Sequence, residues 1–132
     1  MTVFLVKSAV WGGLMSYGAR ARGVKGVIIS GRCRDVMEHE EAGMVVFAKG
    51  QSTLGQRPFT RPSELEVRLN IDGVMIEPGS WMVADQDGVV VIPIGMMESV
   101  KQLCEKGRRV DELCKNGIIE GKGVQETFNQ YR

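Results

Sequence analysis

Several features that would point to common functions are absent from this 132-residue chain. Its 17 basic and 16 acidic residues leave a net charge of +1, so no bulk attraction to nucleic acid or to a membrane surface is indicated. No apolar run approaches membrane-spanning length, and the apolar segment at positions 1–6 is too short for a signal peptide. We therefore expect a partner that is neither nucleic acid nor membrane.

Cysteine is scarce as well. The three cysteines, at positions 33, 104 and 114, are odd in number and lack metal-ligand spacing, so we expect reduced thiols in a cytoplasmic protein. The sequence contains no HExxH, which argues against a zinc peptidase. It also contains no glycine-rich phosphate loop, no Ser-His-Asp order and no CxxC motif.

What is present is an alternation of apolar segments with short polar helices. The pattern predicts strands at 2–6, 24–29 and 44–48, a glycine turn at 11–13, and helices at 14–22 and 34–42. This βαβαβ order usually produces parallel strands joined by crossover helices.

The second half of the chain has a different character. A long irregular loop is expected at 49–63, followed by short strands at 66–70, 74–76, 81–84 and 89–92 and by helices at 96–115 and 124–131. Gly107 interrupts the longer helix and should lower its stability by about 1 kcal/mol relative to alanine. The whole is expected to be a single α/β domain over 1–132 with an additional antiparallel β component.

Arg34 and Asp35 are the best functional candidates. They follow the apolar run 27–29, a strand that we expect to stop at Ser30-Gly31, and open α/β sheets bind ligands beyond the carboxyl ends of strands. Arginine can bind a carboxylate or a developing enolate, and aspartate is a hard oxygen ligand for Mg²⁺ or Mn²⁺. The alternative is an aspartate that merely starts a helix beside an exposed arginine.

Gly12 and Gly13 precede the first predicted helix. Glycine lets the backbone approach a ligand closely, and free amides at a helix N-terminus bind anions. Together with Arg34 they would form one pocket for a small oxo-acid, although two glycines before a helix also suit an ordinary turn.

The only histidine lies within an acidic run, Glu38-His39-Glu40-Glu41. His39 could sit next to a metal ligand or shuttle a proton. The alternative is that this run is the solvated face of a helix.

Four segments together resemble a known family. They are Trp-Gly-Gly-Leu-Met at 11–15, Gly-Val-Ile-Ile-Ser-Gly-Arg-Cys-Arg-Asp at 26–35, Val-Phe-Ala-Lys-Gly at 46–50 and Glu-Pro-Gly-Ser-Trp-Met-Val-Ala-Asp-Gln-Asp-Gly-Val-Val-Val-Ile-Pro at 77–93. Their order and spacing resemble the family of 4-hydroxy-4-methyl-2-oxoglutarate aldolases and regulators of ribonuclease E activity A. The resemblance implies a β/β/α swivelling-domain fold, with this chain as an N-terminally shortened member that spans the C-terminal two-thirds.

The resemblance also implies an activity and an assembly. It implies a class II, Mg²⁺- or Mn²⁺-dependent lyase acting on pyruvate-type oxo-acids, by retro-aldol cleavage, by oxaloacetate decarboxylation or by both, in a homotrimer or hexamer with active sites at subunit interfaces. Arg34 would bind the pyruvyl group, Asp35 would anchor the metal, and the amides around Gly12, Gly13, Leu14 and Met15 would hold the substrate carboxylate. A neighbouring subunit would supply a glutamate, for which Glu112 is the candidate.

The chain departs from the family pattern at three positions. Gly13 stands where the aldolases usually carry an aspartate, and Ser30 and Ser80 replace two other common acids. Loss of the first acid bears on proton transfer in the aldol reaction more than on substrate binding. Two alternatives therefore stay open: a non-catalytic regulator that binds a protein, and a repurposed lyase or cyclase with a larger substrate.

Overall fold

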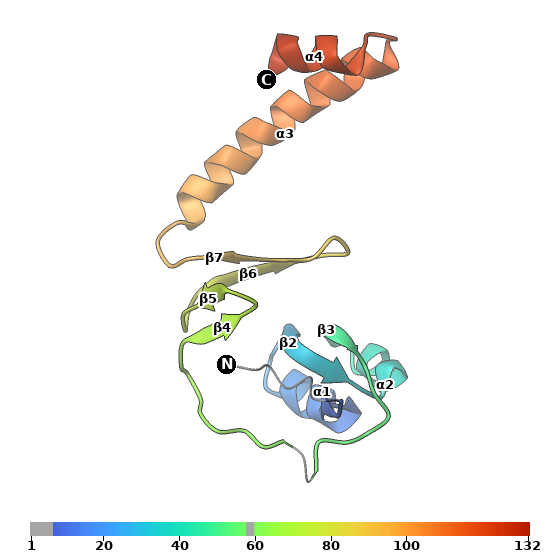
Figure 1. The fold of residues 1–132 in the computed structure, drawn as a ribbon, viewed down its shortest axis with the longest axis vertical. Helices are drawn as coiled ribbons and strands as arrows, with labels where there is room; N and C mark the ends of the chain where they lie inside the picture. The colour runs from blue at the N-terminus through green and yellow to red at the C-terminus, as the bar shows by residue number, and fades with distance from the viewer. Residues whose placement is uncertain (1–6, 58–59) are drawn as a thin grey trace. The chain divides into compact units, whose positions relative to one another are not determined.

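The structure is a computed structural model that describes residues 7–57 and 60–132. The chain forms two compact units, which are described separately below (Figure 1). The first extends to Val67 and includes Ile71–Gly73, and the second contains Arg68–Asn70 and Val74–Arg132. The assignment of 1–132 as a single domain stays a prediction.

Parallel strands and two helices make up the first unit. The strands β1 (Ala9–Trp11), β2 (Gly26–Cys33) and β3 (Val45–Gln51) form a parallel sheet in the order β1-β2-β3. Helix α1 (Gly13–Ala21) connects β1 to β2, and α2 (Val36–Glu41) connects β2 to β3. The two helices contact each other (Figure 1), as expected when successive crossovers of one hand place both on one face of a sheet. The predicted parallel βαβαβ order is confirmed.

The boundaries of the strands differ from expectation in two places. The strand predicted at 2–6 lies outside the described residues, and β1 begins at Ala9, including a residue expected in a turn. Strand β2 does not stop at Ser30-Gly31 but continues to Cys33, with an irregularity in its pairing to β3 between Ile29 and Arg32. A local shift in register lets the strand absorb these two residues. Arg34 and Asp35 consequently follow the end of β2 directly.

The remaining elements are four short strands and two helices. Strands β4 (Leu69–Ile71) and β5 (Val74–Ile76) pair with each other, and β6 (Trp81–Ala84) pairs antiparallel with β7 (Val89–Ile92). In the β6–β7 turn, the Asp85 carboxylate accepts a hydrogen bond from the Asp87 amide at 2.8 Å. Helix α3 (Met97–Ile119) continues through Gly107, and α4 (Val124–Tyr131) has the predicted bounds.

Each unit buries few apolar side chains. Ala9, Cys33 and Met44 are buried in the first unit, and Ile92 and Cys114 in the second. Large apolar side chains remain exposed in both, and on α3 alone these include Leu103 at 67% and Ile119 at 74%. Exposed apolar surface of this extent is typical of surfaces that contact another chain. None of the described helices combines the length and apolar character needed to cross a membrane.

Candidate active site

Residues that follow all three parallel strands line one pocket of about 550 Å³ in the first unit. This volume is in the range typical of small-molecule sites. The lining residues are Gly12, Leu14 and Met15 after β1, Arg34, Asp35 and Glu38 after β2, and Gly55, Gln56 and Arg57 after β3. The pocket therefore lies at the carboxyl ends of the strands, where open α/β sheets place ligands.

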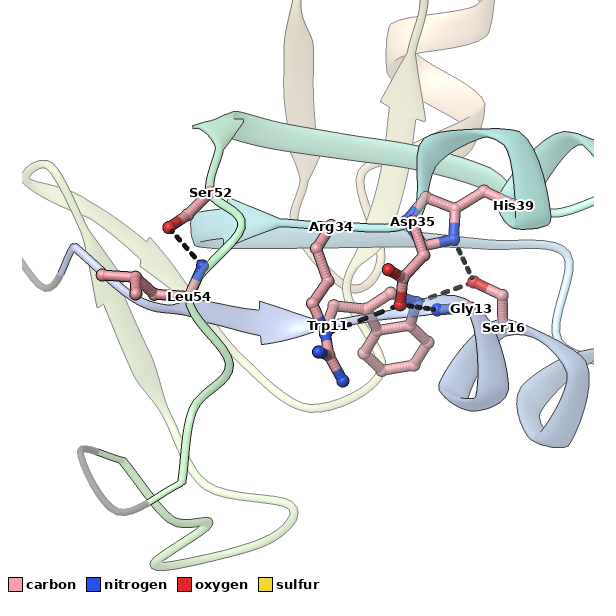
Figure 2. Close-up of polar contacts among 8 residues, drawn as sticks. All are labelled: Trp11, Gly13, Ser16, Arg34, Asp35, His39, Ser52 and Leu54. Atoms are coloured by element: carbon pink, nitrogen blue, oxygen red, sulfur yellow. Dashed lines mark hydrogen bonds and ion pairs between the residues drawn. The ribbon is translucent and has the colours of Figure 1, made fainter.

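The backbone of Asp35 turns its carboxylate toward α1. Asp35 precedes α2 with a left-handed conformation (φ 59°, ψ 47°), and its side chain does not cap that helix. Instead the carboxylate accepts a hydrogen bond from the Gly13 amide at 3.1 Å and lies 3.5 Å from Arg34 Nε (Figure 2). A left-handed residue other than glycine costs about 1 kcal/mol, and such strain is concentrated at functional sites. The Asp35 side chain therefore serves the contact with α1 rather than the cap of α2.

Close packing, rather than turn geometry, requires glycine at positions 12 and 13. Gly12 has an extended backbone (φ −140°, ψ −179°) that any residue can adopt. A Cβ at Gly12 would lie 2.7 Å from Asp35 Oδ2 and 3.0 Å from Arg34 Nε. A Cβ at Gly13 would overlap the Glu38 carboxylate. The two glycines therefore let the Arg34–Asp35 pair and Glu38 approach the N-terminus of α1.

The amides at the start of α1 are not equally available to a ligand. The Gly13 amide donates to Asp35, and the Met15 amide donates to the Gly12 carbonyl at 3.1 Å. Within the part of the chain that the structure describes, the Leu14 amide has no protein acceptor. Of the four residues whose amides were predicted to hold a carboxylate, Leu14 therefore has an amide at the start of α1 that is available to an anion.

Neighbouring loops fix the position of Arg34. Its amide donates to the Trp11 carbonyl at 2.9 Å, and a Cβ at Gly55 would lie 3.5 Å from its Nη1. The loop that carries Gly55 is attached to the sheet, because the Ala9 amide donates to the Leu54 carbonyl at 2.7 Å. Leu54 in turn donates to the Ser52 hydroxyl at 3.2 Å (Figure 2). The backbone of Arg34 is thus fixed at the edge of the pocket, while its side chain remains 48% exposed.

Arg57 is a pocket residue that the sequence did not single out. It lies in the irregular segment after β3, and the only sequence signal was an arginine within a long loop. It gives the pocket a second guanidinium, which favours an anionic ligand.

His39 has a structural position that the sequence interpretation did not foresee. Only 4% of it is exposed, so the solvated-face alternative is wrong for this residue, while Glu40 on the same helix is exposed. His39 Nδ1 lies 2.9 Å from Ser16 Oγ, which also accepts a hydrogen bond from Trp11 Nε1 at 2.8 Å (Figure 2). This chain of contacts joins β1, α1 and α2, and none of its three side chains lines the pocket.

The other candidates lie elsewhere. Ser30 is within β2, Ser80 precedes β6, and neither lines the pocket. Glu112 is in the second unit, on the exposed surface of α3, where its carboxylate lies 3.3 Å from Lys115 Nζ. The three cysteines are free thiols, as expected.

The donor set of the pocket fits Mg²⁺ or Mn²⁺. Among the described residues there is no group of three or more His, Cys, Asp or Glu side chains that could hold a metal ion, but the pocket contains the Asp35 carboxylate. Mg²⁺ is commonly held by one or two carboxylates, with water and substrate oxygens completing its coordination. The residues present therefore suit such an ion together with an oxo-acid.

Comparisons with known proteins identify the family to which the chain is similar. A family model described as "RraA-like: Aldolase/RraA" matches residues 5–91. An uncharacterized protein of Methanocaldococcus jannaschii is 36% identical over 127 residues, which are 93% of this chain and 59% of that protein. The 4-hydroxy-4-methyl-2-oxoglutarate aldolase of Thermus thermophilus is 31% identical over 88 residues, which are 67% of this chain and 53% of the enzyme.

A solved structure agrees in fold. RraAS2 of Streptomyces coelicolor, described as an unusual member of the RNase ES inhibitor RraA protein family, has a TM-score of 0.75 at 23% identity. The match covers 83% of this chain and 56% of that one. The predicted fold class is confirmed, and the chain spans between half and three-fifths of the length of these proteins.

Proposed function

Because the chain belongs to the RraA-like family of aldolases and RraA proteins, we propose that it is a lyase that cleaves pyruvate-type oxo-acids through an enolate. The observation that carries the proposal is the placement of Arg34 and Asp35 beside the N-terminus of α1 in one pocket. This pocket offers a cation, a carboxylate and a backbone amide to the same small ligand. The substrates we propose are oxaloacetate and 4-hydroxy-4-methyl-2-oxoglutarate.

Each pocket residue would bind a different group of the substrate. The Arg34 guanidinium would bind the pyruvyl group and stabilise the negative charge that develops on its C2 oxygen. The Leu14 amide would hold the C1 carboxylate, assisted by the positive end of α1. Asp35 would hold Mg²⁺ or Mn²⁺, which supplies Lewis-acid polarisation of the C2 carbonyl when bound.

One arrangement serves both cleavages. In each substrate the bond that breaks joins C3 to C4, and its electrons pass into the C2 carbonyl to give the enolate of pyruvate. The leaving part is carbon dioxide from oxaloacetate and a second molecule of pyruvate from 4-hydroxy-4-methyl-2-oxoglutarate. The same charge therefore develops beside Arg34 in both reactions.

The first test is oxaloacetate decarboxylation with added Mg²⁺ or Mn²⁺. We expect metal-dependent release of pyruvate that a chelator suppresses. In Arg34→Gln we expect kcat to fall by about 100-fold or more, because one donor that stabilises the developing charge contributes this much. Arg32→Gln is the matched control, since Arg32 is in β2 and its Nη1 donates to the Gln51 carbonyl at 3.0 Å, away from the pocket. Equal rates in the two variants would contradict the proposed site.

We further propose that the active form is a homotrimer or hexamer in which Glu112 of a neighbouring copy approaches the pocket. The exposed apolar side chains of α3 support this, because Leu103, Leu113 and Ile119 would otherwise remain in water. Light scattering coupled to size exclusion should give a mass about three or six times the 14.5 kDa of the chain. A mass of one chain at micromolar concentration would contradict the assembly.

The second candidate is a regulator that binds a ribonuclease without catalysis. It is favoured by the likeness in fold to a member of the RNase ES inhibitor RraA protein family and by the exposed apolar surface. Absence of turnover on both oxo-acids, combined with direct inhibition of a ribonuclease E by the purified chain, would select it over the lyase.

A further inference from the structure

The two carboxylates of the pocket, those of Asp35 and Glu38, differ in their protein partners. Asp35 is engaged by the Gly13 amide and lies beside Arg34. The side chain of Glu38 forms no hydrogen bond or ion pair with any residue of 7–57 or 60–132, although it lines the same pocket. The Glu38 carboxylate is therefore available to a ligand in the pocket, whereas the Asp35 carboxylate is already engaged by protein groups.

Glu38 is also placed away from its expected local role. Asp35 and Glu38 stand at the start of α2 with the spacing of a capping box, in which each side chain would bond to the backbone amide of the other. Neither side chain caps the helix. The Glu38 carboxylate instead occupies the space beside Gly13 where a side chain on α1 would lie.

The retro-aldol reaction needs such a group, and the decarboxylation does not. In 4-hydroxy-4-methyl-2-oxoglutarate, a base removes the proton of the C4 hydroxyl, C4 becomes a carbonyl, and the electrons of the C3–C4 bond form the enolate. The base, now protonated, returns the proton to C3 and completes the second pyruvate. Oxaloacetate has no C4 hydroxyl, so its cleavage requires no base, and water can protonate the enolate.

We infer that Glu38 is the general base of the retro-aldol reaction, an inference that rests on the proposed lyase function. Arg34 and Arg57, the other ionisable residues besides Asp35 that line the pocket, carry their charge permanently and cannot accept a proton. His39 is buried, does not line the pocket and is hydrogen-bonded to Ser16. The absence of a side chain at Gly13 is what gives the Glu38 carboxylate its position.

Comparing the two reactions in Glu38→Gln tests the inference. We expect kcat of the retro-aldol reaction to fall by about 100-fold or more, the usual contribution of general base catalysis, while decarboxylation changes by less than about threefold. Glu40→Gln, which removes the same charge from the same helix outside this pocket, is the control and should leave both rates unchanged.

The outcomes separate this inference from the proposed function. Equal loss of both activities, or no loss of either, would overturn the role of Glu38 while the lyase function stands. A wild-type protein that decarboxylates oxaloacetate but has no retro-aldol activity would also overturn the role of Glu38. If the wild type performs neither reaction, both proposals fail. Mn²⁺ affinity, measured by electron paramagnetic resonance, should be unchanged in Glu38→Gln, and its loss would make Glu38 a metal ligand rather than a base.

Moving the acid back to α1 supplies a rescue. A Cβ at Gly13 would lie 2.6 Å from the Glu38 Cβ, so an aspartate at position 13 requires glycine at position 38. The variant that combines Gly13→Asp with Glu38→Gly should catalyse the retro-aldol reaction at least about tenfold faster than Glu38→Gly alone. A failure to recover activity in a folded double variant would count against a proton-transfer role at this place.

Discussion

Asp35→Asn should abolish most of the metal-dependent lyase activity while leaving the fold intact. Asparagine tolerates the left-handed conformation observed at this position (φ 59°), and its carbonyl oxygen can still accept the Gly13 amide. It cannot supply the negative charge that would hold the proposed divalent cation. Since a bound cation in this role contributes several kcal/mol to stabilising a transition state, we expect a loss of more than about 100-fold in kcat/KM.

The stability of this variant should change little. The Arg34–Asp35 ion pair is partly exposed, with 48% and 35% of the two side chains accessible, and exposed pairs contribute about 1 kcal/mol or less. Asp35→Ala is a poorer probe, because alanine in the left-handed region adds a cost of about 1 kcal/mol that mixes folding with function. Thermal unfolding, Mn²⁺ binding and oxaloacetate turnover should be measured on the same Asp35→Asn sample. Wild-type turnover in that sample would remove Asp35 from the mechanism.

Periodicity and resemblance predicted the order of the elements and the placement of Arg34 and Asp35 after β2. They failed where tertiary contacts decide the outcome. Ser30-Gly31 looks like a strand end, yet pairing on both sides of the irregularity carries β2 on to Cys33. His39 stands in an acidic run that suggests solvent, yet the hydroxyl of Ser16 binds it in the interior. Single-segment patterns contain no information about such partners from other segments.

The polar lining of the pocket was likewise only partly predictable. The glycines at 12 and 13 suggested a close approach but not to what, and the answer is a contact with side chains more than twenty positions away in the sequence. In the sequence Glu38 is one acid among several on a helix face. It differs from Glu40 because its carboxylate fills the space that a side chain at position 13 would occupy, and because it lines the pocket. Spacing can propose a chemistry for a site, but the choice among similar side chains depends on packing.

Gly12→Ala should impair catalysis severely by the addition of one methyl group. The new Cβ would lie 2.7 Å from Asp35 Oδ2 and 3.0 Å from Arg34 Nε, so one or both of these groups must move. Because the backbone at this position is extended, alanine adopts it without strain, and the variant should fold. A displacement of about 1 Å at a reacting group can cost about 100-fold in rate, which is the loss we expect in kcat/KM for oxaloacetate.

A second glycine separates this effect from a general effect of alanine. Gly107 lies within α3, and a Cβ there would meet no atom within 4 Å. Gly107→Ala should therefore raise the free energy of unfolding by about 1 kcal/mol, through helix propensity, and leave turnover unchanged. The two substitutions add the same methyl group, so an inactive but folded Gly12→Ala beside a stabilised, active Gly107→Ala would show that contact with the Arg34–Asp35 pair causes the loss. Full activity in Gly12→Ala would mean that catalysis does not depend on the observed positions of Arg34 and Asp35.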